Sequence, residues 1–244
     1  GGNPSATQSA LIIPKPGANN LFYVFTVDAQ VGLFTGGSTG LQYSVVDMNL
    51  DGGLGDIVPG VFPTLLLDST TEKLAGTKCT NGTDYWVLAH GWNSDSFYAY
   101  KITSAGILSP VVSATGLIHN GSSGQKSEAI GYMKFSHTGN RIALACYQNM
   151  NVVQIFDFDN TTGIVSNPIT DSNFPISSTD GPYGICFSPD DSKLYVNNNE
   201  LDQLPSDSLQ NYYPIKVTDD NKIIMENIKV NNNIQSNSLN TDNI

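Results

Sequence analysis

The chain has 244 residues, of which 39% are hydrophobic and 14% are charged, and its net charge at pH 7 is −11. Arg141 is the single arginine among 11 basic residues. Nucleic-acid backbones and anionic membranes are bound mainly through lysine and arginine, so the composition argues against both as partners. No run reaches the ~18 apolar residues of a membrane span, so we expect no direct membrane insertion.

Short apolar runs separated by polar turns recur along the chain. Four segments share a pattern of two apolar runs around a turn, at residues 10–27, 73–90, 132–147 and 183–198. Pro, Gly, Asn and Asp fill these turns, and they supply the fixed or positive φ angles that hairpins need. Two further apolar runs follow in each complete unit, and helical periodicity is absent. The pattern predicts four β-strands per unit.

The repeat indicates the fold class and its boundaries. Units begin near residues 10, 73, 131 and 183, and a period of about 50 to 60 residues suits the four-stranded blades of a β-propeller. We therefore expect an all-β fold, a β-propeller fragment of about three and a half four-stranded antiparallel blades over residues 1–200. The first run of each unit should lie closest to the axis.

The remaining residues are expected to complete the last blade and then lose order. Residues 201–230 should hold degenerate outer strands of that blade, and residues 231–244 read as a disordered polar tail. Three and a half blades do not close a ring in the usual way and leave open edges. We therefore expect the chain to continue into further blades and domains of a longer protein.

Several motifs resemble known propeller families. FSHTGNRIALA (135–145) and FSPDDSKLYV (187–196) look like repeats of TolB-like and lactonase-like propellers, and IFDFDNTTGIVSNP (155–168) looks like the outer hairpin of the YVTN group. Over about residues 3–200 the chain also resembles the propeller region of Bacteroidetes surface proteins linked to gliding motility and type IX secretion. That resemblance implies an extracellular or cell-surface location and assigns no catalytic residue.

The sharpest signal for a ligand is the segment DMNLDG at residues 47–52. Asp47, Asn49 and Asp51 stand at alternate positions, as in the first half of a calcium loop, where oxygens wrap a hard cation and glycine allows the sharp turn. Asp56 adds a further carboxylate. The twelfth position is Val58 rather than a bidentate glutamate, so a plain β-turn is the alternative. Calcium is the one cofactor that the sequence suggests.

A second candidate site is a ligand-binding rim formed by His90, Trp92 and Asn93, which follow the second apolar run of the second unit. We favour the alternative that Trp92 packs between blades and that His90 is a hydrogen-bonded strand end. His119 and His137 lie in turn-like sequence. A metal site made of all three histidines would require them to converge at one end of the channel.

Signatures of covalent catalysis and of disulfides are weak. No cysteine stands beside a histidine in the sequence. Asp157 and Asp159 are interpreted as turn-stabilising groups rather than an acid–base pair. The three cysteines form no C-x-x-C pair, and we favour buried free thiols over a bridge between Cys146 and Cys186.

Together these features favour a non-enzymatic binding and scaffolding module of an exported or cell-surface protein, with protein or glycan surfaces as partners. Two alternatives stay open. One is a lactonase-like or metal-dependent hydrolase, which requires Asp, Glu, His and Asn side chains from several blades to converge at the channel mouth. The other is a structural spacer in a large adhesin, which predicts no pocket at all.

Overall fold

The computed structural model describes residues 2–29, 39–60, 63–120, 127–147, 150–172, 181–198, 212–217 and 223–225. Within these ranges the regular elements are β-strands and two short 3₁₀ helices, η1 (Asp51–Gly53) and η2 (Ser127–Ala129), with no α-helix. The expected all-β class is therefore confirmed. In the part of the chain covered by these ranges, no helix is long and apolar enough to span a bilayer.

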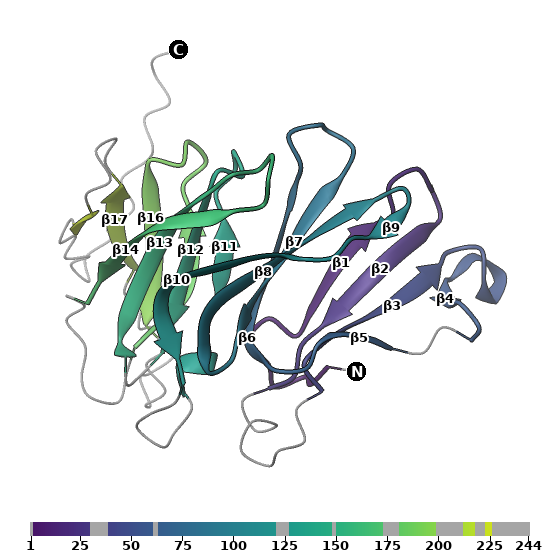
Figure 1. Cartoon of the computed structure of the whole chain (residues 1–244), viewed down its shortest axis with the longest axis horizontal. Helices are drawn as coiled ribbons and strands as arrows, with labels where there is room; N and C mark the ends of the chain where they lie inside the picture. The colour runs from purple at the N-terminus through teal and green to yellow at the C-terminus, as the bar shows by residue number, and fades with distance from the viewer. Residues whose placement is uncertain are drawn as a thin grey trace, which may run out of the picture.

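Four antiparallel sheets follow one another along the chain (Figure 1). The first contains β1 (Ala10–Pro14), β2 (Leu21–Thr26), β3 (Leu41–Asp47), β4 (Asp56–Ile57) and β5 (Thr64–Leu67). The second contains β6 (Thr70–Lys78), β7 (Tyr85–Gly91), β8 (Ser94–Thr103), β9 (Gly106–Ile107) and β10 (Val111–His119). In both sheets the path runs in chain order through the first three strands. The last two strands then both pair with the third, β4 and β5 with β3, and β9 and β10 with β8.

The third and fourth sheets are simple four-stranded meanders. The third runs through β11 (Met133–Phe135), β12 (Arg141–Cys146), β13 (Val152–Phe158) and β14 (Val165–Asp171), and the fourth through β15 (Pro182–Phe187), β16 (Lys193–Asn198), β17 (Tyr212–Val217) and β18 (Ile223–Met225). Two outer strands thus lie in the segment where degenerate ones were expected, and the fourth blade has four strands rather than half a blade. The predicted tail, 231–244, lies outside the described residues.

The first hairpins of the third and fourth sheets repeat the same turn. Ser136 donates its N–H to the carbonyl of Arg141 at 3.0 Å, and Ser188 donates to Lys193 at 2.8 Å. A residue with positive φ stands at the matching place in each turn, Gly139 at 68° and Asp191 at 57°. The SHTGN and SPDDS segments therefore adopt one geometry, which confirms that the units are structural repeats.

Alternation along the strands explains how the sheets stack. In β7, Val87 packs into a buried cluster shared by the first and second sheets, whereas its neighbour Leu88 packs into the cluster shared by the second and third. In β12 of the third sheet, Leu144 packs into the cluster shared with the second sheet, and its neighbour Ala145 packs into the cluster shared with the fourth. Successive side chains of a strand point to opposite faces. Each inner sheet is therefore apolar on both faces and needs a neighbour on each side.

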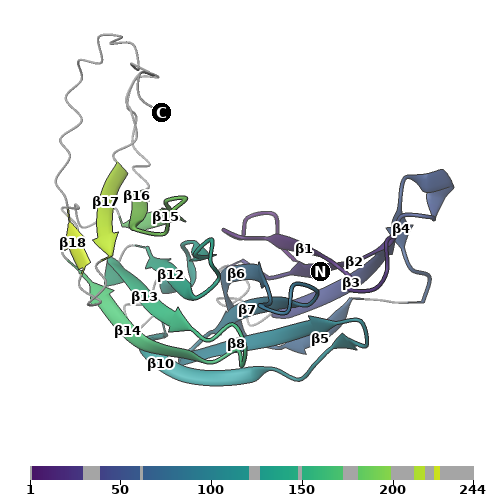
Figure 2. The ribbon, with the colours of Figure 1, turned by 90° about the horizontal axis from the view of Figure 1, so that it is seen from above.

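The stacked sheets fan out in an open arc (Figure 2). The first strand of each sheet lies on the inner side of the arc, and β6 lies beside both β1 and β11. The arrangement is that of consecutive blades of a β-propeller, and the prediction that the first strands are innermost is confirmed.

Candidate functional site

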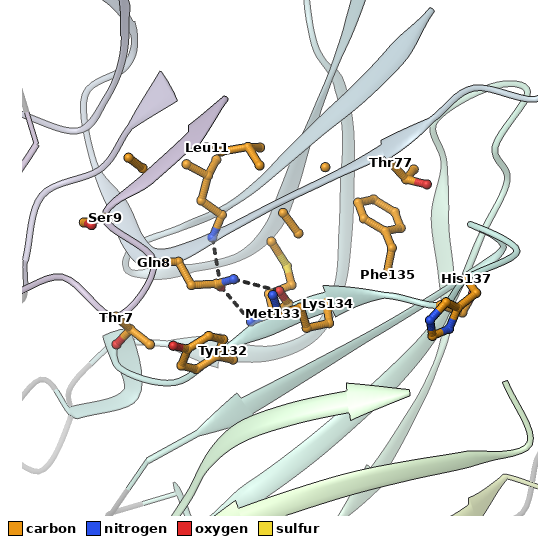
Figure 3. A pocket seen from close by; sticks show the side chains of 15 residues that line it. Thr7, Gln8, Ser9, Leu11, Thr77, Tyr132, Met133, Lys134, Phe135 and His137 are labelled. Atoms are coloured by element: carbon orange, nitrogen blue, oxygen red, sulfur yellow. Dashed lines mark hydrogen bonds between the residues drawn. The ribbon is translucent and has the colours of Figure 1, made fainter. Parts of the chain in front are cut away.

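A hollow of about 500 Å³ lies on the inner side of the arc, between the first three blades (Figure 3). Its walls are the segment leading into β1, the middle of β6, and β11 with the turn that follows it; the lining residues are Thr7–Leu11, Leu74–Thr77 and Tyr132–His137. We call it the axial hollow. Inner strands form it because they stand at the sheet edges closest to the axis.

The side chain of Gln8 ties the three walls together. Its Oε1 accepts the backbone N–H of Leu74 at 3.2 Å and that of Met133 at 2.8 Å, while its Nε2 donates to the carbonyl of Met133 at 3.0 Å. Figure 3 shows the amide spanning the space between the strands. These bonds satisfy backbone groups that face the axis and have no neighbouring strand. Gln8 therefore builds the hollow by joining blades.

The ionisable side chains on the lining are Tyr132, Lys134 and His137, and none of the lining residues is an aspartate or glutamate. Lys134 is exposed, with Nζ 5.5 Å from the ring centre of Tyr132. Tyr132 also packs edge-on against Tyr183 of the fourth blade. The hollow thus offers hydroxyl groups, aromatic rings and one exposed cation.

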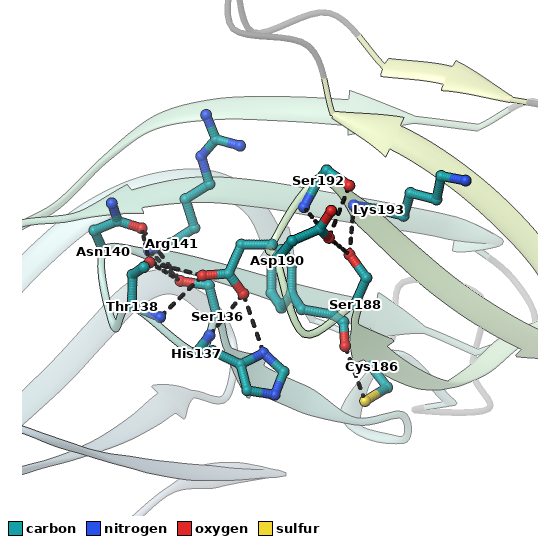
Figure 4. A network of polar contacts seen from close by, with 12 residues as sticks. Ser136, His137, Thr138, Asn140, Arg141, Cys186, Ser188, Asp190, Ser192 and Lys193 are labelled. Carbon is teal, nitrogen blue, oxygen red and sulfur yellow. Dashed lines mark hydrogen bonds and ion pairs between the residues drawn. The ribbon is translucent and has the colours of Figure 1, made fainter. Parts of the chain in front are cut away.

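His137 stands at the end of the hollow next to the fourth blade. Its Nδ1 lies 3.1 Å from Oδ1 of Asp191, which also accepts the His137 backbone N–H at 2.7 Å. Oδ2 of Asp191 accepts the N–H and the hydroxyl of Thr138 at 2.9 and 2.8 Å (Figure 4). Partial burial raises the pKa of the Asp191 carboxyl group. These hydrogen bonds outweigh that effect and hold the pKa below its ordinary value.

This carboxylate fixes the orientation of the imidazole and favours the tautomer with hydrogen on Nδ1. Nε2 is then the ring nitrogen that can accept a proton from a water molecule or a ligand. A histidine oriented in this way is chemically suited to act as a general base. The His137 side chain is 57% exposed, so it is accessible from solvent.

A second polar group lies in the interface of the second and third blades and is fully buried. Lys73 donates from Nζ to three carbonyls around η2, those of Glu128, Ala129 and Ile130, at 2.8, 3.2 and 2.9 Å. Burial lowers the pKa of Lys73. Next to it, Glu72 binds the backbone N–H and hydroxyl of Thr7 at 2.7 and 2.6 Å. The group holds three segments together across the interface.

Two histidines complete this buried group. His90 and His119 stack with ring centres 4.0 Å apart, and Nε2 of His119 lies 3.2 Å from Sγ of Cys146. Burial, and then the nearby charge of Lys73, lower the pKa of His90 to about 3, and burial holds that of His119 well below its ordinary value. Burial raises the pKa of the Cys146 thiol to about 11. Both imidazoles and the thiol are therefore neutral near pH 7.

The predicted ligand-binding rim is only partly at the surface. His90 is 1% exposed, with Nδ1 2.9 Å from the carbonyl of Gly91. It is the hydrogen-bonded strand-end histidine that we favoured, and it is buried as well. Trp92 is half-buried and Asn93 is exposed with φ of 56°, and their N–H groups bond to Ser69 and His119. A ligand contact by Trp92 and Asn93 stays a prediction.

The calcium segment forms a turn that connects β3 to β4 through η1. The register places Asp47 opposite Asp56, while Asp51 begins η1 with φ of 47°. One oxygen of Asp47 accepts Nδ2 of Asn20 at 2.6 Å and the N–H of Asn49 at 2.9 Å. No three His, Cys, Asp or Glu side chains are arranged around a metal position within the described ranges. Calcium binding through these residues stays a prediction.

The other residues singled out from sequence have structural partners. Asp159 accepts two backbone N–H groups and the Thr162 hydroxyl in its own turn, and Asp157 accepts Nδ2 of Asn167 at 2.7 Å. The interpretation as a turn-stabilising group is confirmed for Asp159, whereas Asp157 stands within β13 and bonds across to the neighbouring strand β14. Cys146 is buried and free, as favoured, but Cys186 is exposed rather than buried. Cys186 lies at an alternate position of β15 to the buried Ile185 and Phe187, and so points to the other face.

Sequence reasoning missed the pair of His137 and Asp191, the joining role of Gln8 and the buried Lys73. His137 and Asp191 occupy the same turn in consecutive repeats. Aligning the two repeats would therefore have paired the SHTGN and SPDDS turns as neighbours in space.

The sequence matches no protein-family model and no curated protein. The structure is similar to a putative 6-phosphogluconolactonase from Bacteroides fragilis, with a TM-score of 0.55 and 11% identity over 92% of this chain and 56% of that one. It is also similar to the periplasmic gluconolactonase of Pseudomonas aeruginosa, with a TM-score of 0.56 and 14% identity over 88% of this chain and 52% of that one. The chain spans about half the length of these structures. Its structural neighbours are lactonase-like β-propeller proteins, and the likeness shows the fold.

Proposed function

We propose that the chain is a non-enzymatic binding and scaffolding module of an exported or cell-surface protein, with the axial hollow as its binding site. The observation that carries this proposal is the chemistry of the hollow. Hydroxyl groups, aromatic rings and strand-edge backbone line it, and no carboxylate is among the lining residues. Such a lining suits hydrogen bonding and ring stacking with a polar ligand. Of the two partner classes expected from sequence, a glycan matches it better than a protein surface.

The exported location rests on the resemblance of residues 3–200 to surface proteins linked to gliding motility and type IX secretion. The periplasmic location of one structural neighbour points the same way. Antibodies against the chain, applied to intact and to lysed cells of the source organism, test this part. Labelling of intact cells is expected, and labelling seen only after lysis would contradict it.

Binding is tested with an array of neutral oligosaccharides and with calorimetry on those that bind. Ser9→Trp fills the hollow from the segment leading into β1, because Ser9 is a half-buried residue of its lining and alternates with Ala10, which the strand register turns to the opposite side. Ala114→Trp is the control, an exposed alanine of β10 away from the hollow. We expect binding to be lost in the first variant and retained in the second. Equal affinities in both variants, or no oligosaccharide bound by the unmodified chain, would refute the proposal.

A lactonase-like hydrolase is the second candidate function, and the pair of His137 and Asp191 favours it. An imidazole held by a carboxylate at the end of a hollow can take a proton from water as the water oxygen attacks a lactone carbonyl carbon. The imidazolium can then return that proton to the ring oxygen as the bond between the carbonyl carbon and the ring oxygen breaks, which gives the open hydroxy acid. The spacer alternative predicts no pocket, so the axial hollow favours the two candidates above over it.

Hydrolysis of glucono-1,5-lactone, followed by acid release and corrected for the spontaneous rate, separates the two candidates. The binding proposal predicts no rate above that background. A rate that disappears in His137→Ala and persists in Ala114→Trp would overturn it in favour of the hydrolase.

A further inference from the structure

The first blade has one face that no other described sheet covers. Side chains on its other face, such as Ile13, Tyr23 and Phe25, pack against the second blade. The strand register places the alternate residues together on the opposite side, which we call the open face: Ala10, Ile12, Pro14, Phe22, Val24, Thr26, Gln42, Ser44, Val46, Ile57 and Leu65.

The open face is mostly apolar, with Thr26, Gln42 and Ser44 as its polar members. Ile12, Ile57 and Leu65 are 63%, 48% and 54% exposed, and Phe22, Val24 and Val46 between them are only partly buried. No charged residue is among its members. Contiguous apolar surface of this kind marks an interaction site, because leaving it in water costs free energy in proportion to its area. Solvent-facing sheets normally carry polar or charged side chains instead.

Its position shows what kind of surface fits it. The three interfaces within the chain all form when one blade packs face to face on the next, and each contains a buried apolar cluster. The open face continues this series by one step beyond the first blade. At the other end of the arc, the fourth blade has a far face too, on which Cys186 is exposed and Tyr195 is 37% exposed.

The size of the arc suits closure by a second copy. The chain matches 56% and 52% of the lengths of two propeller structures. A second copy therefore supplies about as many residues as such a ring still needs. Two arcs of four blades give eight, within the range of about four to eight blades that propellers use. If two arcs are related by a two-fold axis, the two junctions between them are identical. The ring formed in this way closes and leaves no blade face open.

We propose that two copies of this chain close into one ring, with the open face of each copy packed on the far face of the other copy's fourth blade. The axial hollow is walled by inner strands of the first three blades only, and ring closure would enclose it with the same strands of the second copy. Ring formation is independent of the proposed binding function, because mass measurements and cross-linking detect it without any ligand.

The first test is the mass of the whole 244-residue chain in solution. Sedimentation velocity over a range of concentrations should show a species of twice 26.2 kDa. Because each chain carries a net charge of −11, association should strengthen with added salt as repulsion is screened. The double variant Ile12→Lys with Leu65→Lys should weaken dimerisation by more than about tenfold, because two charges would be buried without partners.

Val112→Lys is the matched control, a valine of β10 that is 53% exposed and lies outside the open face. It should leave the dimer unchanged, while circular dichroism confirms that all variants fold. A monomer at every concentration, or equal weakening in the control, would refute the proposal.

The second test identifies which faces meet. Ile12→Cys places a thiol on β1 of the open face, and Cys186 is an exposed thiol on the corresponding inner strand β15. Mild oxidation should produce an intermolecular bridge between residues 12 and 186, detected by mass spectrometry of the digested dimer. Bridges between two residues 12 alone would show that open faces pack on each other and would overturn the ring.

Discussion

Replacing Lys73 by methionine tests whether the buried polar group holds the second and third blades together. Methionine keeps the length of the apolar stem and removes the ammonium group. Three carbonyl oxygens, those of Glu128, Ala129 and Ile130, then lose a donor that lies 2.8 to 3.2 Å away. A buried acceptor left without a partner costs about 1–3 kcal/mol.

The variant no longer buries the ammonium charge of Lys73, and this gain in stability offsets part of the loss. We therefore expect the free energy of unfolding to fall by about 3 kcal/mol, because three carbonyls left without a donor outweigh that gain. Urea denaturation followed by tryptophan fluorescence measures it. Lys78→Met is the control, since Lys78 is an exposed residue of the same strand β6, and it should change stability by less than about 0.5 kcal/mol. Equal stability of the two variants would refute the argument.

Acid should destabilise the fold, because His90 has a pKa of about 3 in the folded protein and of 6.5 in its ordinary state. The stability that neutral His90 contributes is complete above pH 6.5 and is lost as the pH falls toward 3. About 3 kcal/mol of it is lost by pH 4.5. A stability–pH profile no steeper than that of His90→Gln would contradict this. Asn160→Ala removes three hydrogen bonds, to the backbone of Lys78, Thr80 and Gly139, and should lower the unfolding free energy by about 2–3 kcal/mol in urea denaturation. Gly163→Ala puts a Cβ 2.7 Å from a buried tryptophan ring at φ of 83°, and thermal unfolding should show a larger loss than Gly82→Ala, which has positive φ but open space. If the calcium hypothesis holds, Ca²⁺ should raise the melting temperature relative to EDTA, and Asp47→Asn should abolish the difference.

Local sequence was sufficient to predict the strands, because strand and turn preferences are set by nearby residues. The SHTGN and SPDDS turns carry Gly139 and Asp191 where the backbone needs positive φ. The same regularity predicted which strand of each unit lies innermost. Outer strands of the last blade were expected over residues 201–230 from two short apolar runs, and the pairing of β17 with β16 makes this blade a full sheet rather than half of one.

The candidate site was far less accessible to sequence reasoning. His90 was named as part of a rim, yet it is buried because β7 is covered on both faces by neighbouring blades. His137 was set aside as a turn residue, although it meets Asp191 across a separation of 54 residues. The partner of each histidine depends on how one blade is rotated against the next, which no local pattern encodes.

The sequence by itself determined the repeat, the inner position of the first strand of each blade and the apolar alternation that requires blades to stack. Those properties follow from short-range sterics and from the two-residue period of side chains along a strand. The tertiary structure alone decided which polar groups meet: Gln8 between three inner strands, Lys73 among the η2 carbonyls, and His137 with Asp191 beside the axial hollow. It decided these because each contact joins different blades, and the distance between blades is fixed by the packing of whole sheets.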